Sequence, residues 1–238
     1  MTSGPNTPPS TEPLNASHDD DPAGYDEMRA AGHMARRRLA FYDEVVRGSE
    51  GTVVEIGMGT GVLLRELAKR HPDRSFVGVE PLANYVEFAR ERAAEEGLRN
   101  VRAEVGTGED LVAAVGAGAA GLVISVDMLH HVADVREVAD QVARAAAPGC
   151  QWRAMEPNRV HPYVLAYHVL TDGERTFPVR PFLRTAAAAG WRLQGRRNLY
   201  LYPSTVARVP AWAEKVERRL EGLRPVAGAV VLDLRKVG

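Results

Sequence analysis

Three alternating glycines stand two residues after an acid in the sequence VVEIGMGTG. They are Gly57, Gly59 and Gly61, and the acid is Glu55. Glycine permits positive φ and lets the backbone approach a ligand without an obstructing Cβ. A P-loop would require a Gly-Lys-Ser/Thr ending, and the dinucleotide fingerprint would require glycine where Val62 stands. Because Glu55 would repel a pyrophosphate and attract an ammonium group, the pattern favours a ligand with an amino-acid portion.

A second acid, Glu80, ends the apolar run Gly78-Val79-Glu80-Pro81. A carboxylate at the carboxyl end of the second strand of an α/β sheet can accept both hydrogen bonds of a ribose diol. The alternative is an ordinary solvent-exposed glutamate at a strand end. The preceding glycine loop favours the ribose role.

Residues that could contact a ligand, most of them polar, gather where two later strands are expected to end. They are Ser125, Asp127, Met128, His130 and His131 after one strand, and Glu156, Pro157 and Asn158 after the other. Open α/β sheets bind ligands at this edge. Adjacent side chains at a helix start point about 100° apart, so we expect His130 to face the cleft and His131 to be structural. Whether the cleft histidine is a general base or a supporting hydrogen-bond donor stays open.

These residues require elements that bring them to one edge, and strand-like and helix-like segments do alternate after Gly51. Expected strands are 52–56, 75–79, 101–105, 122–126 and 151–156; expected helices are 62–70, 82–96, 109–115 and a helix from Val135 to a stop at Pro148-Gly149. Strands separated by such helices predict right-handed crossovers and a parallel sheet covered on both faces. The fold class is therefore α/β, a Rossmann-like open sheet. Later strands at 191–202 and 229–234, joined through a helix at 209–223, predict an antiparallel C-terminal edge.

The chain before the glycine loop divides into two parts. Residues 1–22 hold five of the fifteen prolines and few apolar groups, which predicts a disordered tail. The domain is then 23–238, with an N-terminal lid helix at 23–48 and a lid insert at 159–180. The run Arg36-Arg37-Arg38 could hold an anionic ligand, although a solvated helix face is favoured. Because the tail has no Lys or Arg, the folded part is slightly basic, which keeps an anionic substrate open.

Taken in order, VVEIGMGTG, the strand-end Glu80, and ISVDMLHHV followed by PGC resemble class I S-adenosylmethionine-dependent methyltransferases. The closest resemblance is to the small-molecule branch whose fourth strand leads into Leu-His-His. It covers about residues 25–158 in motif order. The resemblance implies S-adenosyl-L-methionine as cofactor, S-adenosyl-L-homocysteine as product, and methyl transfer to an oxygen or nitrogen, less readily a carbon, of a small molecule.

The resemblance also implies roles for individual residues. Cofactor contacts are expected from Glu55, Gly57, Gly59, Gly61, Glu80, Pro81, Thr107, Gly108, Glu109 and Ser125. Catalytic candidates are His130, His131 and Asp127. Substrate contacts are expected from Tyr25, Met128, Glu156, Asn158, Tyr163 and Tyr167. Tyr163 and Tyr167 lie one helical turn apart, as a pocket wall requires, and plain helix packing would give the same spacing.

Three positions depart from the pattern of the resembling proteins. Thr107 stands where an Asp usually contacts the adenine amino group, so the Thr107 hydroxyl or the neighbouring amides would have to substitute. Gly121 stands where an Asp commonly begins the fourth strand, and Cys150 replaces a second glycine after Pro-Gly. Cys150 is expected to be a small buried residue.

Composition excludes several classes of protein. A net charge of −1 gives no broad attraction to nucleic acid, and a single cysteine excludes a disulfide framework. No apolar run is long enough for a membrane helix and no signal sequence is evident. We expect a cytoplasmic monomer or homodimer that binds neither membrane nor nucleic acid. Asp127, Glu156 and Asn158 could offer oxygen ligands to magnesium, but Pro157 separates two of these residues, and no metal is expected.

Two other functions remain to be distinguished. A non-catalytic S-adenosylmethionine-binding sensor or partner subunit would keep the glycine loop, but the full-length lid insert favours an enzyme. An NAD-dependent oxidoreductase is disfavoured by Val62. Neither Asp/Asn-Pro-Pro-Tyr nor Pro-Cys follows the fourth strand, which disfavours methylation of adenine or glutamine amino groups and covalent attack on cytosine.

Overall fold

The computed structural model describes residues 21–171 and 175–237. Its described strands form a seven-stranded sheet in the order β3-β2-β1-β4-β5-β7-β6. The strands are β1 (Thr52–Ile56), β2 (Phe76–Glu80), β3 (Val101–Val105), β4 (Ala120–Val126), β5 (Ala146–Pro157), β6 (Trp191–Leu199) and β7 (Ala229–Lys236). Strands β3, β2, β1, β4 and β5 pair in parallel, and β7 pairs antiparallel with both β5 and β6.

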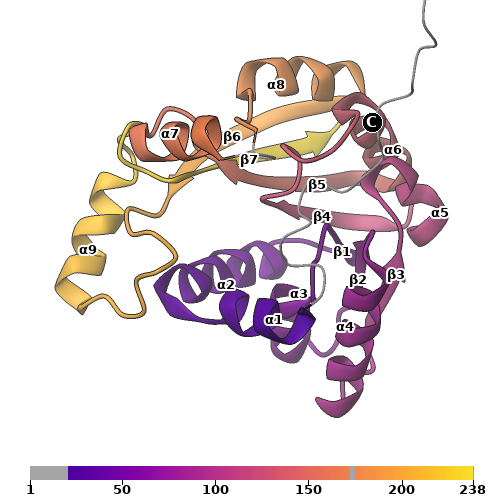
Figure 1. Ribbon diagram of the computed structural model, residues 1–238. Helices are drawn as coiled ribbons and strands as arrows, with labels where there is room; N and C mark the ends of the chain where they lie inside the picture. The colour runs from indigo at the N-terminus through magenta and orange to yellow at the C-terminus, as the bar shows by residue number, and fades with distance from the viewer. Residues whose placement is uncertain (1–20, 172–174, 238) are drawn as a thin grey trace, which may run out of the picture.

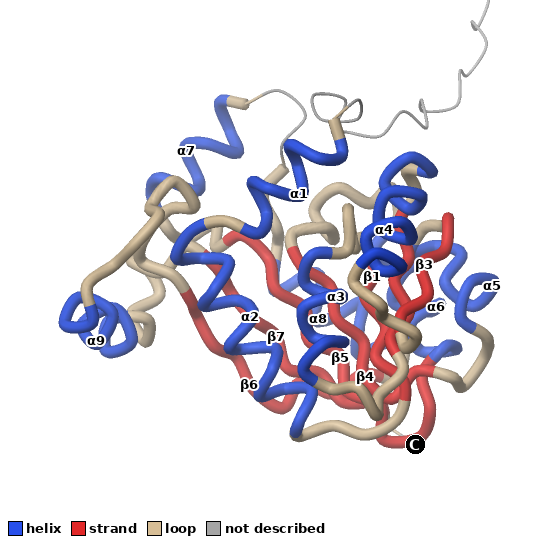
Figure 2. Tube along the Cα trace, turned by 90° about the horizontal axis from the view of Figure 1, so that it is seen from below, coloured by secondary structure: helices blue, strands red, loops and turns tan. Residues whose placement is uncertain are grey.

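Helices cover both faces of this sheet (Figure 1). The described helices are α1 (Pro22–Ala30), α2 (Gly32–Arg47), α3 (Val62–Arg70), α4 (Ala83–Glu95), α5 (Leu111–Val115), α6 (Val135–Ala145), α7 (Pro162–Leu170), α8 (Val179–Ala188) and α9 (Ala211–Leu220), with a 3-10 turn at Gly108–Asp110. One core lies between the sheet and α2, α3 and α4, and a second lies between the sheet and α5, α6 and α8. Figure 2, seen from below, has α1 to α4 in front of the strands.

The predicted α/β fold is confirmed, including the mostly parallel Rossmann-like sheet with helices on both faces. One detail differs from the simplest expectation. The antiparallel strand β7 does not form the edge, because it lies between β5 and β6. It pairs with β5 from Ala229 to Arg235 and with β6 from Ala229 to Lys236, so the C-terminal segment is held within the sheet.

The segment 23–48, predicted as one N-terminal lid helix, contains two helices. Gly32 separates α1 from α2 with φ of +85°, a left-handed value that favours glycine. The His33 amide donates to the Val206 carbonyl at 3.0 Å, which ties this break to the C-terminal third. The predicted tail lies outside the described residues as far as residue 20. Asp21 and Pro22 belong to α1, since the Asp21 carboxylate accepts from the Gly24 amide.

Two sequence departures have structural causes. A Cβ added at Gly121 would lie 2.0 Å from the Glu50 carbonyl oxygen, so the chain crossing there excludes the Asp that begins the fourth strand in resembling proteins. Cys150 is buried, as expected, and burial raises the pKa of its thiol to about 12. Strand β5 already begins at Ala146, so Pro148-Gly149 lies in the strand rather than in a turn before it.

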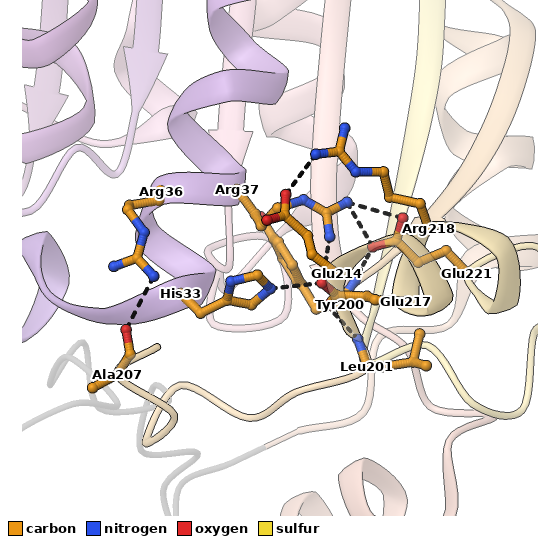
Figure 3. A network of polar contacts seen from close by, with 10 residues as sticks. All are labelled: His33, Arg36, Arg37, Tyr200, Leu201, Ala207, Glu214, Glu217, Arg218 and Glu221. Atoms are coloured by element: carbon orange, nitrogen blue, oxygen red, sulfur yellow. Dashed lines mark hydrogen bonds and ion pairs between the residues drawn. The ribbon is translucent and has the colours of Figure 1, made fainter. Parts of the chain in front are cut away.

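A buried ion-pair network fixes α9 against α2 (Figure 3). The Glu217 carboxylate is fully buried and accepts from His33 Nε2 at 2.6 Å and from Arg37 Nη1 at 2.5 Å. Arg37 Nη2 reaches Glu221 at 3.0 Å. Burial acts to raise the pKa of Glu217, but hydrogen bonds from His33 and the Leu201 amide, together with Arg37, hold it below its usual value.

The same two carboxylates hold the chain that follows β6. Glu221 accepts from the Tyr200 amide at 2.8 Å, and Glu217 accepts from the Leu201 amide at 3.0 Å. Tyr200 has φ of +67°, a value that is costly for a bulky side chain and persists only where the surroundings enforce it. The α2–α9 network therefore fixes the position of a strained tyrosine. Among the described residues, no helix has both the length and the apolarity to cross a membrane.

Candidate active site

The glycine loop after β1 lies between α1 and the segment that follows β4. Gly57, Gly59 and Gly61 all have positive φ, at +67°, +57° and +75°. A Cβ on Gly57 would come within 2.9 Å of Met128 Cβ, and a Cβ on Gly59 would come within 2.9 Å of Tyr25 Cε1. The loop thus needs glycine both for its conformation and for its closest neighbours. Tyr25, expected from the sequence at the substrate, covers the loop.

Glu55 is an acid buried beside the glycine loop. Its side chain is 4% exposed, and its Oε2 has no hydrogen-bond partner among the described residues. Burial raises its pKa to about 8, although Arg38, Arg29 and the Leu64 amide oppose the rise. A buried carboxyl oxygen without a partner is costly unless a ligand supplies one. An ammonium group of a ligand would satisfy this oxygen, and the contact expected from the sequence stays a prediction.

Glu80 ties the end of β2 to the glycine loop. Its Oε2 accepts from the Gly59 amide at 3.0 Å, and its Oε1 accepts from the Leu82 amide at 3.3 Å. The carboxylate thus stands at the carboxyl ends of β1 and β2, where the sequence placed a ribose contact. Pro81 follows it at the surface.

The segment expected at an adenine ring follows β3. Thr107 and Glu109 are partly exposed, and Gly108 is buried, where a Cβ would meet Val138 and Ile56 side chains within 3.3 Å. Gly108 begins the 3-10 turn. The segment lies beside the end of β2, since the Gly106 amide donates to the Glu80 carbonyl at 3.0 Å.

His130 and Glu156 form a buried pair across the ends of β4 and β5. His130 Nδ1 lies 2.6 Å from Glu156 Oε2, with exposed side-chain fractions of 3% and 0%. Glu156 Oε1 accepts from the amides of Met128 and Leu129 at 3.2 and 2.9 Å. Burial raises the Glu156 pKa, but these donors oppose it. Glu156, expected at the substrate, instead orients His130 and the segment that carries it.

Two further histidines contact His130. The ring centroids of His130 and His131 are 3.9 Å apart, and those of His130 and His168 of α7 are 5.6 Å apart. Burial, reinforced by His130, lowers the pKa of His131 to about 4, so His131 is neutral at ordinary pH. Helix α7 of the lid insert therefore reaches the site through a histidine rather than through the predicted tyrosines.

Other predicted residues lie in different surroundings. Tyr163 and Tyr167 of α7 are 66% and 46% exposed. The Ser125 hydroxyl is buried and accepts from the Trp152 indole at 3.0 Å. Asn158 donates to the carbonyls of Arg224 and Ala227, both at 2.7 Å. Ser125 and Asn158 thus have structural partners within the fold.

Asp127 and three residues that sequence reasoning did not select complete this region. Asp127 has φ of +52°, which Asp tolerates better than most residues, and its carboxylate lies 3.5 Å from Arg29 of α1. Arg38 of α2 is 6% exposed, and Tyr200 is 4% exposed with its hydroxyl 3.4 Å from Met155 Sδ. The run of three arginines indicated Arg38 as a residue that could hold an anion, but no sequence pattern distinguishes Tyr200.

Comparisons with known proteins agree with this geometry. Residues 53–149, from β1 into β5, match a family model described as a methyltransferase domain. A tRNA (guanine-N(7)-)-methyltransferase of Levilactobacillus brevis is 32% identical over 83 residues, which cover 31% of this chain and 39% of that protein. The chain thus spans about two fifths of the length of that curated relative and less of the next, at 28%.

Solved structures resemble the chain over nearly all its length. A geranyl diphosphate C-methyltransferase from Streptomyces coelicolor superimposes with a TM-score of 0.66 at 20% identity, covering 94% of this chain and 89% of that one. A possible histamine N-methyltransferase from Thermotoga maritima gives 0.65 at 19% identity, covering 94% and 100%. At these identities, the likeness shows the fold.

Proposed function

From the premise that the chain contains a methyltransferase domain with the fold of class I S-adenosylmethionine-dependent methyltransferases, we propose that it methylates an oxygen or nitrogen atom of a small molecule. The observation that carries the proposal is the His130–Glu156 pair, which lies at the sheet edge that also carries the glycine loop. A small acceptor is supported by the covering helices: α1 places Tyr25 on the loop and α7 places His168 beside His130.

The residues at the glycine loop suit the cofactor of this family. Glu55 would take its ammonium group, the Gly57 to Gly61 backbone would lie along its amino-acid portion, and Glu80 would take its ribose hydroxyls. When bound, S-adenosylmethionine supplies an activated methyl group on sulfur. The protein must then align an acceptor and exclude water, and it needs a base only if the acceptor carries a proton to be lost.

His130 is the residue that we assign to proton removal. Glu156 accepts from Nδ1–H, and this hydrogen bond selects the tautomer in which Nε2 is the basic nitrogen. Nε2 can then take a proton from a hydroxyl or ammonium group of the acceptor. The neutral His131, whose ring lies tilted beside that of His130, adds no positive charge that would oppose protonation of His130.

The test uses purified full-length protein, labelled S-adenosylmethionine and a library of metabolite acceptors. His130→Ala should lower turnover roughly 10²- to 10⁴-fold, as for loss of a general base. His71→Ala is the control, because His71 pairs with Asp43 at the C-terminal end of α3, and it should retain most activity. A loss below tenfold for His130→Ala would refute the base. S-adenosylmethionine binding without methyl transfer to any acceptor would favour the sensor or partner-subunit alternative.

The partial-length relatives provide a second candidate, methylation of guanine in tRNA. The net charge of −1 disfavours it, because tRNA binding usually relies on a basic surface. Unmodified tRNA therefore belongs in the same assay. Methyl incorporation into tRNA, with none into small molecules, would replace the small-molecule proposal.

A further inference from the structure

Arg38 has a buried guanidinium group with few hydrogen-bond partners among the described residues. Its side chain lies on the inner side of α2 and is 6% exposed. In the part of the chain that the structure describes, its one hydrogen bond runs from Nη2 to the Arg29 carbonyl oxygen at 3.1 Å. Arginine carries five N–H donors, and a buried charge without a hydrogen-bonded partner is expensive. Arg38 therefore has donors that no hydrogen bond of the described residues uses.

Its neighbours in the arginine run have other partners. Arg37 binds Glu217 and Glu221 of α9, and Arg36 donates to the Ala207 carbonyl at 3.1 Å (Figure 3). These two side chains join α2 to the C-terminal third of the molecule. The run is thus not one solvated face, because Arg36 and Arg37 bond to the C-terminal third and Arg38 is buried.

A second arginine and several polar groups lie near Arg38. Arg29 is close enough to lower the Arg38 pKa beyond the effect of burial, while Tyr200, Asp127 and Glu55 act to raise it. The Asp127 carboxylate pairs with Arg29 at 3.5 Å. Because Glu55 has a pKa of about 8, it is mostly protonated near pH 7. Glu55 then carries little negative charge to offset the two arginines.

There is space beside these arginines for a ligand group. A cavity of about 320 Å³ is lined by Arg29, Arg38 and the exposed Arg36, and by Val62 and Leu63, the first residues of α3. Asp26, Glu66, Arg65, Arg92 and Glu96 also line it, and Arg65 pairs there with Asp26 and Glu96. Helix α3 has Gly61 as its N-cap and no side-chain capping bond from that residue. The backbone amides of a helix N-terminus favour an anion. Two arginines and a helix start therefore meet at one cavity next to the glycine loop.

We propose that Arg38 and Arg29 form an anion-binding subsite for a carboxylate or phosphate group of a ligand that occupies the site. The assignment of that ligand rests on the proposed function, since either the cofactor's carboxylate or an anionic group on the methyl acceptor would supply the chemistry. A guanidinium binds both kinds of oxyanion through charge-assisted, bidentate hydrogen bonds.

The experiment measures binding by calorimetry to wild-type protein and to Arg38→Met. The probes are S-adenosylhomocysteine, its decarboxylated analogue, and inorganic phosphate, which is added both to the free protein and to the S-adenosylhomocysteine complex. Arg47→Met is the matched control, since Arg47 lies on the same helix and its side chain is 62% exposed. Because methionine replaces a buried charge with an apolar chain of similar length, the ligand-free variant should be as stable as the wild type.

Loss of the subsite should weaken binding of the anionic probe roughly 10- to 100-fold. If S-adenosylhomocysteine weakens and the decarboxylated analogue does not, the anion is the cofactor's carboxylate. If phosphate binding is lost and S-adenosylhomocysteine binds as before, the anion belongs to the acceptor. Unchanged binding of both probes in Arg38→Met would overturn the proposal.

Two further outcomes separate this inference from the proposed function. Wild-type protein that binds phosphate through Arg38 but does not bind S-adenosylhomocysteine would keep the subsite and dismiss the function. If Arg38→Met fails to fold, Arg29→Met serves instead, because the Arg29 side chain is 26% exposed. Arg29→Met with unchanged affinity for both anionic probes would count against the subsite.

Discussion

At the scale of single residues, three buried glutamates at one sheet edge have three different surroundings. Glu55, Glu80 and Glu156 end or nearly end β1, β2 and β5. Glu80 and Glu156 accept from backbone amides of the loops beside them, whereas one oxygen of Glu55 has no partner among the described residues. Identical side chains therefore have different roles. Glu156 orients His130, whereas Glu55 has an oxygen that a cationic ligand group could bind.

This difference predicts a proton released on cofactor binding. With a pKa of about 8, Glu55 is mostly protonated near pH 7, and it must ionise to pair with an ammonium group. S-adenosylhomocysteine affinity should therefore rise with pH as pH approaches 8, because binding releases a proton. Calorimetry near pH 7 in buffers of different ionisation enthalpy should detect that release.

Glu55→Gln supplies the control for this prediction. Its amide keeps the shape of the side chain and can still accept from the Leu64 amide, but it has no proton to release. The variant should bind more weakly and without the Glu55-linked proton. Proton release equal to that of the wild type would assign the linkage to another group.

At the scale of elements, α9 positions the chain around Tyr200 through buried hydrogen bonds and ion pairs. Its Glu217 and the following Glu221 link α2 to Tyr200, a tyrosine that the structure places beside Arg38 and Asp127. Burial raises the Tyr200 pKa above its usual range, so its hydroxyl stays protonated. A helix remote from the glycine loop thus sets one wall of the region around the arginines.

Substitution of Glu217 should loosen this wall. Glu217→Gln removes the charge that His33 and Arg37 share, and the Tyr200 and Leu201 amides should exchange hydrogen faster. Because the folded-state pKa of Glu217 lies below its usual value, its contribution is present above about pH 4.5 and is lost as pH falls through the folded pKa.

Hydrogen exchange followed by mass spectrometry measures this effect. Arg218→Met is the matched control, because Arg218 also lies on α9 and pairs with Glu214 with its side chain 64% exposed. It should leave the exchange of residues 200–201 unchanged. Exchange in Glu217→Gln no faster than in Arg218→Met would show that the α2–α9 network does not hold the segment.

The sequence predicted the elements that have strong periodicity and missed those set by distant contacts. Apolar runs and glycine breaks located β1, β3 and α3 at their observed bounds. The break at Gly32 was not predicted, because its cause is a hydrogen bond to Val206 far along the chain. For the same reason, the pattern ISVDMLHHV placed His130 at the sheet edge but could not reveal that Glu156 binds it.

At the scale of the whole molecule, the sheet brings distant parts of the chain to one edge. The glycine loop comes from the first crossover, the histidines from the end of β4, and the covering side chains from α1 and α7. The C-terminal strand β7 lies between β5 and β6. It therefore supports β5, the strand that carries Glu156. We place the S-adenosylmethionine site at this edge.

Titration of S-adenosylhomocysteine into the full-length protein tests that claim most directly, with NAD⁺ as the competing ligand. Gly59→Ala places a Cβ 2.9 Å from Tyr25 in a left-handed conformation, whereas Gly222→Ala meets nothing within 4 Å and is the matched control. We predict that the wild type binds one S-adenosylhomocysteine per chain and does not bind NAD⁺. Gly59→Ala should bind S-adenosylhomocysteine at least tenfold more weakly, and Gly222→Ala should bind it as the wild type does. Absence of S-adenosylhomocysteine binding to the wild type, or equal affinity in the two glycine variants, would contradict that claim.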